Sequence, residues 1–172
     1  MSRINDSYEP EDTADILRGY AFEGNMRRAL QGKKGQKFLR ELEAALLSLP
    51  EKKLCEGSLA GFKIQYDPDP EWSSHKEKFM ATGQVCALGA VAIARETAKG
   101  RKREDVLQAL ADDEDPDEPE WSKTKETAHY LKICHPLAFA IIERNDECTA
   151  RNDGERYELV LAWVRRQIKE VK

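Results

Sequence analysis

The clearest candidate for chemistry in this sequence is Cys86, which follows Gln84 by two positions. The pattern predicts a helix over 84–97, and a cysteine in its first turn has its thiolate favoured by the helix dipole and by free N–H groups. With Gln84 as a donor to an oxyanion, this resembles the local pattern of papain-like cysteine hydrolases. Such enzymes also need a histidine and an Asn or Asp that orients it. The side chains available for those roles are His129, His135, Asn145 and Asp146.

The surroundings of Cys86 favour another interpretation. Every residue from Val85 to Ala94 is apolar or small, and a helix that is apolar on all sides is a buried helix. A cysteine in such a segment usually packs as a small hydrophobic residue. We therefore lean towards a protein that is not an enzyme, and we keep a cysteine-dependent hydrolase centred on Cys86 as an alternative.

A second polar group, Asn145-Asp146-Glu147, follows the buried stretch from Leu137 to Ile142 of a predicted helix. Two carboxylates and an amide could bind a metal ion or a cationic partner. The simpler interpretation is that Asn145 ends the helix while Asp146 and Glu147 face water.

The cysteines give no support to a structural metal. Zinc sites require closely spaced ligand pairs, and no such pair occurs among Cys55, Cys86, Cys134 and Cys148. We expect free, mostly buried thiols, with no metal and no cofactor.

The third candidate is a basic segment, in which seven basic residues and one acid lie between Arg18 and Arg40. Such side chains could contact nucleic acid phosphates or an acidic protein surface. The chain carries a net charge of −4, and the aromatic residues of this segment, Tyr20, Phe22 and Phe38, belong to the apolar positions of the predicted helices. A solvated charged face is therefore the competing interpretation. The candidate binding residues are Arg27, Arg28, Lys33, Lys34, Lys37 and Arg40.

Two predicted helices flank this basic segment. One runs from residue 12 or 13 to 31. The other carries an apolar stripe from Phe38 to Leu49 and stops at Pro50. The predicted turn is Gly32 to Gly35, and so short a link predicts that the two helices are antiparallel.

The rest of the chain predicts a hairpin or short strands, a central buried helix and further helices. Near-alternation places the strands within 53–67, and an Asn152–Glu155 capping box predicts the start of the last helix. The fold class is mainly α (α+β), a compact domain of about six helices with a small β hairpin. The helices expected after the hairpin cover 84–97, 104–111, 122–133, 136–145 and 152–171, with loops at 67–70 and 112–120. Segments 67–97 and 115–145 also share a faint echo, for which chance resemblance is the preferred explanation.

Length and composition indicate one domain. A chain of 172 residues with 40% hydrophobic and 35% charged residues suits a single globular core. We expect residues 1–11 to form a flexible tail and 12–172 a single helical domain. No apolar run approaches the ~20 residues of a membrane helix, and the polar N-terminus is not a secretory signal. A cytoplasmic protein without membrane contact is the expectation.

Several blocks, in the same order, resemble an uncharacterised family of small bacteriophage and prophage proteins. They are RALQGKKGQKFLREL at 28–42, ALLSLPEKKL at 45–54, GQVCALGA at 83–90, AIIERNDE at 140–147, and Glu155-Arg156 with Trp163-Val164. The insert at 66–82 is longer than is usual in the family. The family has no assigned activity, so the resemblance implies a phage-encoded protein of the bacterial cytoplasm and no mechanism.

These observations order three hypotheses for function. The first is a non-enzymatic phage accessory protein that binds a host or phage macromolecule, most readily a protein, to counter a defence system. The second is a nucleic-acid-binding protein that uses the Arg27–Arg40 face, and the third is the hydrolase centred on Cys86.

Overall fold

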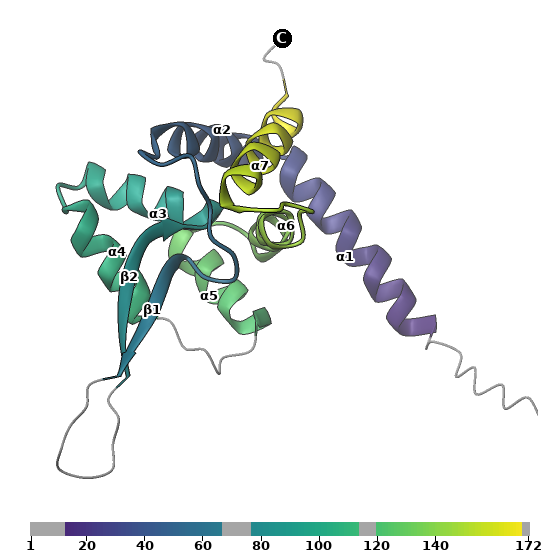
Figure 1. Cartoon of the computed structure of the whole chain (residues 1–172). Coiled ribbons are helices and arrows are strands. Elements are labelled where there is room, and N and C mark those ends of the chain that lie inside the picture. The colour runs from purple at the N-terminus through teal and green to yellow at the C-terminus, as the bar shows by residue number, and fades with distance from the viewer. Residues whose placement is uncertain (1–12, 67–76, 114–119, 170–172) are drawn as a thin grey trace, which may run out of the picture.

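A computed structural model describes residues 13–66, 77–113 and 120–169, and the expected tail at 1–11 lies outside these ranges. The described residues form seven helices and one two-stranded antiparallel sheet, which confirms a mainly α fold with a small β hairpin (Figure 1). The elements, in order, are α1 (Thr13–Gln31), α2 (Lys33–Ser48), β1 (Ala60–Tyr66), β2 (Glu77–Val85), α3 (Ala87–Ala98), α4 (Arg103–Asp112), α5 (Glu120–Leu131), α6 (His135–Asp146) and α7 (Asp153–Gln167).

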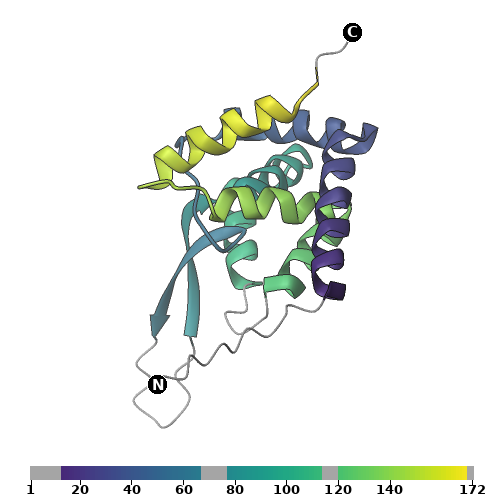
Figure 2. The same ribbon diagram turned by 90° about the vertical axis from the view of Figure 1, so that its right-hand side faces the viewer.

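The core is built around α3, as its composition predicts. Every residue from Ala87 to Ile93 is buried, and small side chains let neighbouring helices approach closely. The stripe of α2 covers one side of this core, with Leu39, Leu42 and Leu46 fully buried. Figure 2 shows α2 and α7 side by side as an upper layer, with α6 beneath them and α1 along one edge.

The link between α1 and α2 is shorter than predicted. Only Gly32 interrupts the helices, and Lys33 to Gly35 already belong to the first turn of α2. A Cβ on Gly35 would lie 1.8 Å from the carbonyl oxygen of Ala29. A residue without a side chain is therefore needed where the two backbones cross. The helices meet at a corner and are not antiparallel (Figures 1 and 2).

The hairpin extends further along the chain than predicted. β2, at Glu77–Val85, lies wholly beyond the predicted range of 53–67, and it takes in Gln84 and Val85, which were expected to begin a helix. β1 pairs with β2 in an antiparallel register that places Phe62 opposite Ala81. Gln108 of α4 bonds the outer edge of β2. Its Oε1 accepts from the Ala81 N–H at 3.3 Å, and its Nε2 donates to the Phe79 carbonyl at 2.7 Å. The predicted loop at 67–70 lies outside the described residues.

The remaining helices agree with the predictions, with shifted ends. α5 begins at Glu120 and not at Ser122, whereas the Oδ1 of Asn152 caps α7 by accepting from the Glu155 N–H at 2.9 Å. Glu155 returns its bond to the Arg151 N–H, at 2.7 Å, so the box is shifted by one residue. The echo is not a structural repeat, since 77–85 is a strand and its counterpart, 126–134, lies largely in α5.

Candidate binding sites

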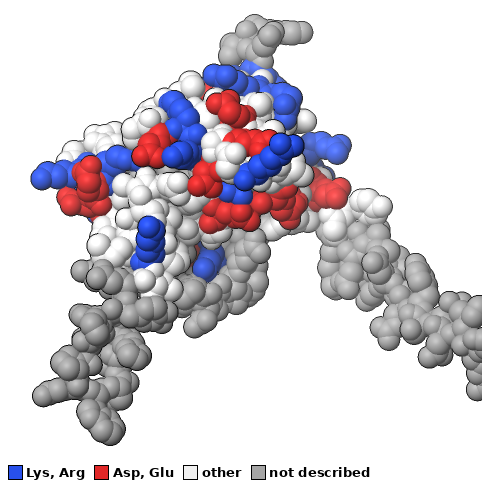
Figure 3. All heavy atoms as spheres, viewed as in Figure 1, with Lys and Arg blue, Asp and Glu red and all other residues white. Residues whose placement is uncertain are grey.

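The predicted basic residues lie together at the corner between α1 and α2. Arg27, Arg28, Lys33, Lys34, Lys37 and Arg40 are all exposed. Three further exposed cations from the other end of the described chain join them: Arg165, Arg166 and Lys169. We call these nine residues the basic corner. Figure 3 shows Lys and Arg side chains gathered over α2 and α7, with acidic side chains among them.

A buried glutamine holds this corner together. Gln36 is only 7% exposed, and its Nε2 donates to the Leu30 carbonyl at 2.8 Å and to the Gln167 carbonyl at 2.9 Å. Its Oε1 accepts from the Lys169 N–H at 2.7 Å. One side chain of α2 therefore satisfies backbone groups where α1 and α7 end, and buried polar groups require such partners.

Two of the cations also help to hold the joint. The Nη2 of Arg40 donates to the Lys169 carbonyl at 3.0 Å, and the Nε of Arg165 pairs with Glu43 of α2 at 2.7 Å. In contrast, no ion pair or hydrogen bond within the described chain engages the side chains of Lys33, Lys34 or Lys37. The same holds for Arg27, Arg28 and Arg166, so these six side chains are the ones available to a partner.

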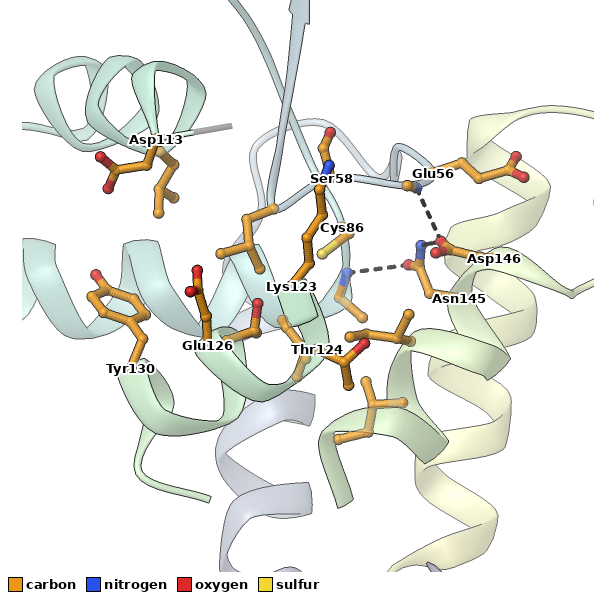
Figure 4. A pocket seen from close by; sticks show the side chains of 18 of the residues that line it. Glu56, Ser58, Cys86, Asp113, Lys123, Thr124, Glu126, Tyr130, Asn145 and Asp146 are labelled. Carbon is orange, nitrogen blue, oxygen red and sulfur yellow. Dashed lines mark hydrogen bonds between the residues drawn. The ribbon is translucent and has the colours of Figure 1, made fainter. Parts of the chain in front are cut away.

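A second candidate site is a pocket of about 570 Å³ at the centre of the fold, which we call the central pocket (Figure 4). The segment 56–59 closes one side, and α3, α4, α5 and α6 supply the remaining walls. Its polar lining comes from Glu56, Ser58, Cys86, Arg101, Asp113, Lys123, Thr124, Glu126, Thr127, Tyr130, Asn145 and Asp146.

Asn145 forms the base of one end of this pocket. The side chain is 1% exposed, and its Oδ1 accepts from the Ala87 N–H at 3.1 Å, at the start of α3. Its Nδ2 donates to the Cys55 carbonyl at 2.9 Å and to Asp146 Oδ1 at 2.6 Å. Asn145 does not end α6, which runs to Asp146 with Glu147 as its C-cap. It instead fixes α6 to α3 and to the chain before β1.

Asp146 is half-buried at the pocket wall and does not simply face water. Its Oδ1 accepts from the Gly57 N–H at 3.2 Å as well as from Asn145. Burial raises the pKa of the Asp146 carboxyl, and these two hydrogen bonds oppose the rise. Glu147 is exposed and lies instead beside a groove lined by Met26 and Trp163. Asn145 and Asp146 therefore share a site that Glu147 does not join.

A buried arginine braces the same end. Arg156 is 7% exposed and its Nε donates to the Asn145 carbonyl at 3.0 Å. Its two terminal nitrogens reach Asp153, at 3.4 Å, and Glu56. The segment before β1, the end of α6 and the start of α7 are thereby joined, so the Asn145 end of the pocket is a rigid wall.

The structure places Cys86 outside the helix and away from His129 and His135, the two histidines nominated as its partners. Cys86 is the N-cap of α3, where its Sγ accepts from the Gly89 N–H at 3.4 Å. Burial raises the pKa of the thiol. Gln84 turns away to donate to Asp153 Oδ2 at 3.0 Å, and neither His129 nor His135 lines the pocket. The expectation of a thiol that packs is confirmed.

The other cysteines are free thiols, and the described carboxylates form no metal-binding group. Cys55, Cys134 and Cys148 are free like Cys86, and Cys134 is exposed while the others are buried, as predicted. Within the described ranges, no three His, Cys, Asp or Glu side chains are grouped so as to hold a metal ion.

Sequence reasoning missed the residues that tertiary contacts bring to these sites. Arg165 and Lys169 gave no sequence signal as parts of the basic corner, since Lys169 follows Arg40 by 129 positions. Gln36, whose hydrogen bonds hold the corner together, was not singled out either. Asp113 and Tyr130 likewise lie in separate elements around the pocket. A spacing rule cannot find them.

No protein-family model, curated protein or solved structure matches this chain. Among the helices described, none combines the length and the apolar character needed to cross a bilayer.

Proposed function

We propose that this is a non-enzymatic binding protein that docks its basic corner onto an acidic surface of a partner macromolecule. The observation that carries the proposal is the joining of three chain segments, at the ends of α1 and α7 and the start of α2, into one exposed cationic surface. Opposite charges at an interface steer encounter and set specificity. A surface fixed by buried hydrogen bonds also loses little freedom on binding.

A protein is the partner that the corner suits best. On the outer face of α2, Arg40, Ala44 and Leu47 follow one another at helical spacing. Leu47 is 47% exposed, so apolar contact area borders the charges. Glu43 pairs with Arg165, and Figure 3 shows acidic side chains among the cations. A mixed surface of this kind resembles a protein interface more than a uniformly basic nucleic acid groove.

The resemblance to small phage proteins supplies the setting of the proposal. A phage-encoded accessory protein acts in the bacterial cytoplasm, where a host or phage protein would be the target. Blocking a bacterial defence system is a role that needs binding alone and no catalytic group.

The test replaces Lys33, Lys34 and Lys37 together by glutamate. Arg40 is left intact because its bond to Lys169 holds the corner. Acidic residues in the first turn of α2 favour the helix dipole, so the variant should fold at least as well as the native chain. The matched control replaces three exposed lysines elsewhere, Lys63, Lys102 and Lys132, by glutamate.

Each protein would be immobilised and used to capture partners from phage-infected bacterial lysate, with and without nuclease. A specific protein should be retained by the native chain and by the control after nuclease treatment, and should be lost with the Lys33/Lys34/Lys37 variant. Equal capture by all three proteins would mean that the corner is only solvated surface.

Nucleic acid is the second candidate, favoured by one observation. Lys33 and Lys34 lie in the first turn of α2, which has no acidic residue, and helix N-termini attract phosphate. Binding of a labelled DNA duplex should then weaken steeply with salt, with a log–log slope of about −0.9 for each phosphate contacted. The absence of any such binding at low salt would exclude this candidate.

A further inference from the structure

The central pocket is a second site, independent of the basic corner. Its volume of about 570 Å³ lies within the range of roughly 300–1,000 Å³ that small-molecule sites occupy. Leu88 of α3, Val106 of α4 and Ile141 of α6 give it apolar walls. Such walls suit the methylene groups of a ligand, and the charged lining decides what its polar groups must be.

More negative than positive side chains line the pocket. Four carboxylates and two cations line it. Glu56 is paired with Arg156, and Arg101 is paired with Glu96 at 3.3 Å. Apart from Lys123, which also lines the pocket, the remaining charged groups are three carboxylates: Asp113, Glu126 and Asp146. Within the described chain no ion pair engages Asp113 or Glu126. The pocket therefore favours a cation over an anion.

These carboxylates lie at two opposite ends. Figure 4 shows Asp113, Glu126 and Tyr130 on one side of the pocket and Asp146 on the other, with Lys123 between them. Tyr130 is 46% exposed, so its ring is open to a cation as well as to the apolar part of a ligand. Because apolar walls separate the two acidic ends, the pocket suits a ligand that carries a positive charge at each end of an apolar chain.

We propose that the central pocket binds a small aliphatic diamine. One ammonium group lies between Asp113, Glu126 and the ring of Tyr130, and the other lies at Asp146. The methylene chain lies on the apolar walls.

The direct test is calorimetric titration of the full chain with putrescine and with cadaverine. Butylamine carries one of the two charges and butanediol carries none. Saturable one-to-one binding of a diamine, at least about tenfold tighter than that of butylamine, is expected, since loss of one charged end is worth roughly a factor of ten. Butanediol should not bind. Equal affinity for butylamine and the diamines, or no binding of either diamine at about 10 mM, would overturn the proposal.

Variants assign the two ends. Asp146→Asn keeps an oxygen that can accept from Gly57 and Asn145, so the fold is preserved, and Glu126→Gln alters an exposed side chain. Each should weaken diamine binding about fivefold, as loss of a partly exposed ion pair does. The matched control is Glu158→Gln, an exposed residue of α7 outside the pocket. An equal loss in the control would show that the diamine senses only the overall negative charge.

Filling the pocket provides a test that does not depend on charge. Ala109 lines the wall from α4 and is half-buried, so Ala109→Trp places a large side chain in the cavity. Binding should be lost while the variant unfolds cooperatively in urea. A folded Ala109→Trp protein that binds the diamine as tightly as the native chain would contradict the proposal.

Discussion

The Oδ1 of Asn145 accepts a hydrogen bond from the backbone N–H of Ala87 at 3.1 Å, and this contact joins the end of α6 to the start of α3. The same side chain donates to the Cys55 carbonyl from its Nδ2. A single buried amide thus satisfies backbone groups from two distant segments. The central helix and the chain that leads into β1 are positioned through it, and with them one end of the pocket.

Replacement of Asn145 by alanine should therefore be costly. The Ala87 N–H and the Cys55 carbonyl would lose this partner, and each buried polar group left unpaired costs about 1–3 kcal/mol. We expect the free energy of unfolding in urea to fall by ~2–4 kcal/mol. Asn152→Ala is a useful comparison, since it removes one exposed cap bond and should cost only ~1 kcal/mol. A loss at Asn145 no larger than at Asn152 would contradict this role.

Because α1 and α2 cross closely at Gly35, we expect the free energy of unfolding to be sensitive to a single methyl group added there. Gly35→Ala places a Cβ 1.8 Å from the Ala29 carbonyl oxygen, so one helix must move. We expect a loss of ~2 kcal/mol or more, measured by urea denaturation. Gly19→Ala in α1 is the matched control, because nothing lies within 4 Å of its Cβ. This change should stabilise by ~0.5–1 kcal/mol through helix propensity. Similar effects at both positions would show that the crossing is loose.

The elements that sequence reasoning predicted are those whose signal is local. The stripe of α2 repeats with the helical period and is buried as expected, and the small residues of α3 indicated a central helix. β2 was missed because Phe79 and Met80 are adjacent and break the alternation of a strand. Its pairing with β1 and its bonds to Gln108 are set by distant residues.

The candidate sites divide in the same way. The basic residues from Arg27 to Arg40 are consecutive enough to be seen in the sequence, whereas Arg165 and Lys169 reach them only through contacts with α2. Asn145 was singled out as one of three polar neighbours. The structure keeps Asn145 and Asp146 together through a hydrogen bond, whereas Glu147 follows α6 as its C-cap and lines another groove.

Two leucines test the packing of the predicted stripes. Leu42 of α2 is fully buried and Leu161 of α7 is 5% exposed, so Leu42→Ala and Leu161→Ala should each lower the free energy of unfolding by ~2–5 kcal/mol. Leu47→Ala, on the exposed side of α2, should change it by less than ~0.5 kcal/mol. A loss under ~1 kcal/mol at a buried position would mean that its stripe faces solvent or a partner.

The thiols should differ sharply in reactivity. Cys134 is exposed, whereas Cys86 and Cys55 are buried. Burial raises the pKa of Cys55 to about 12 and raises that of Cys86 further. In the native protein, a water-soluble alkylating agent should modify Cys134 rapidly and Cys86 only at the rate of unfolding. Cys134→Ser should remove the rapid phase. Fast native labelling of Cys86, identified by peptide mapping, would instead restore the hydrolase hypothesis.

The ion pair between Glu41 and Arg95 should make stability depend on pH. The two side chains meet through two hydrogen bonds, of 2.6 and 2.8 Å, which lower the pKa of Glu41 below its ordinary value of 4.5. A carboxyl whose pKa is lower in the folded than in the unfolded state stabilises the fold above the unfolded value. That contribution is lost as the pH falls through the folded value. About a third of each side chain is exposed, so water screens the pair and its contribution should be only ~0.5–1 kcal/mol.

Glu41→Gln should therefore be less stable than the native protein near neutral pH, and the difference should shrink below about pH 4. Urea denaturation of both proteins across this range measures it, with Glu158→Gln as the unpaired control. A Glu41→Gln deficit that is the same at low and neutral pH would show that the loss arises from packing and not from the charge of Glu41.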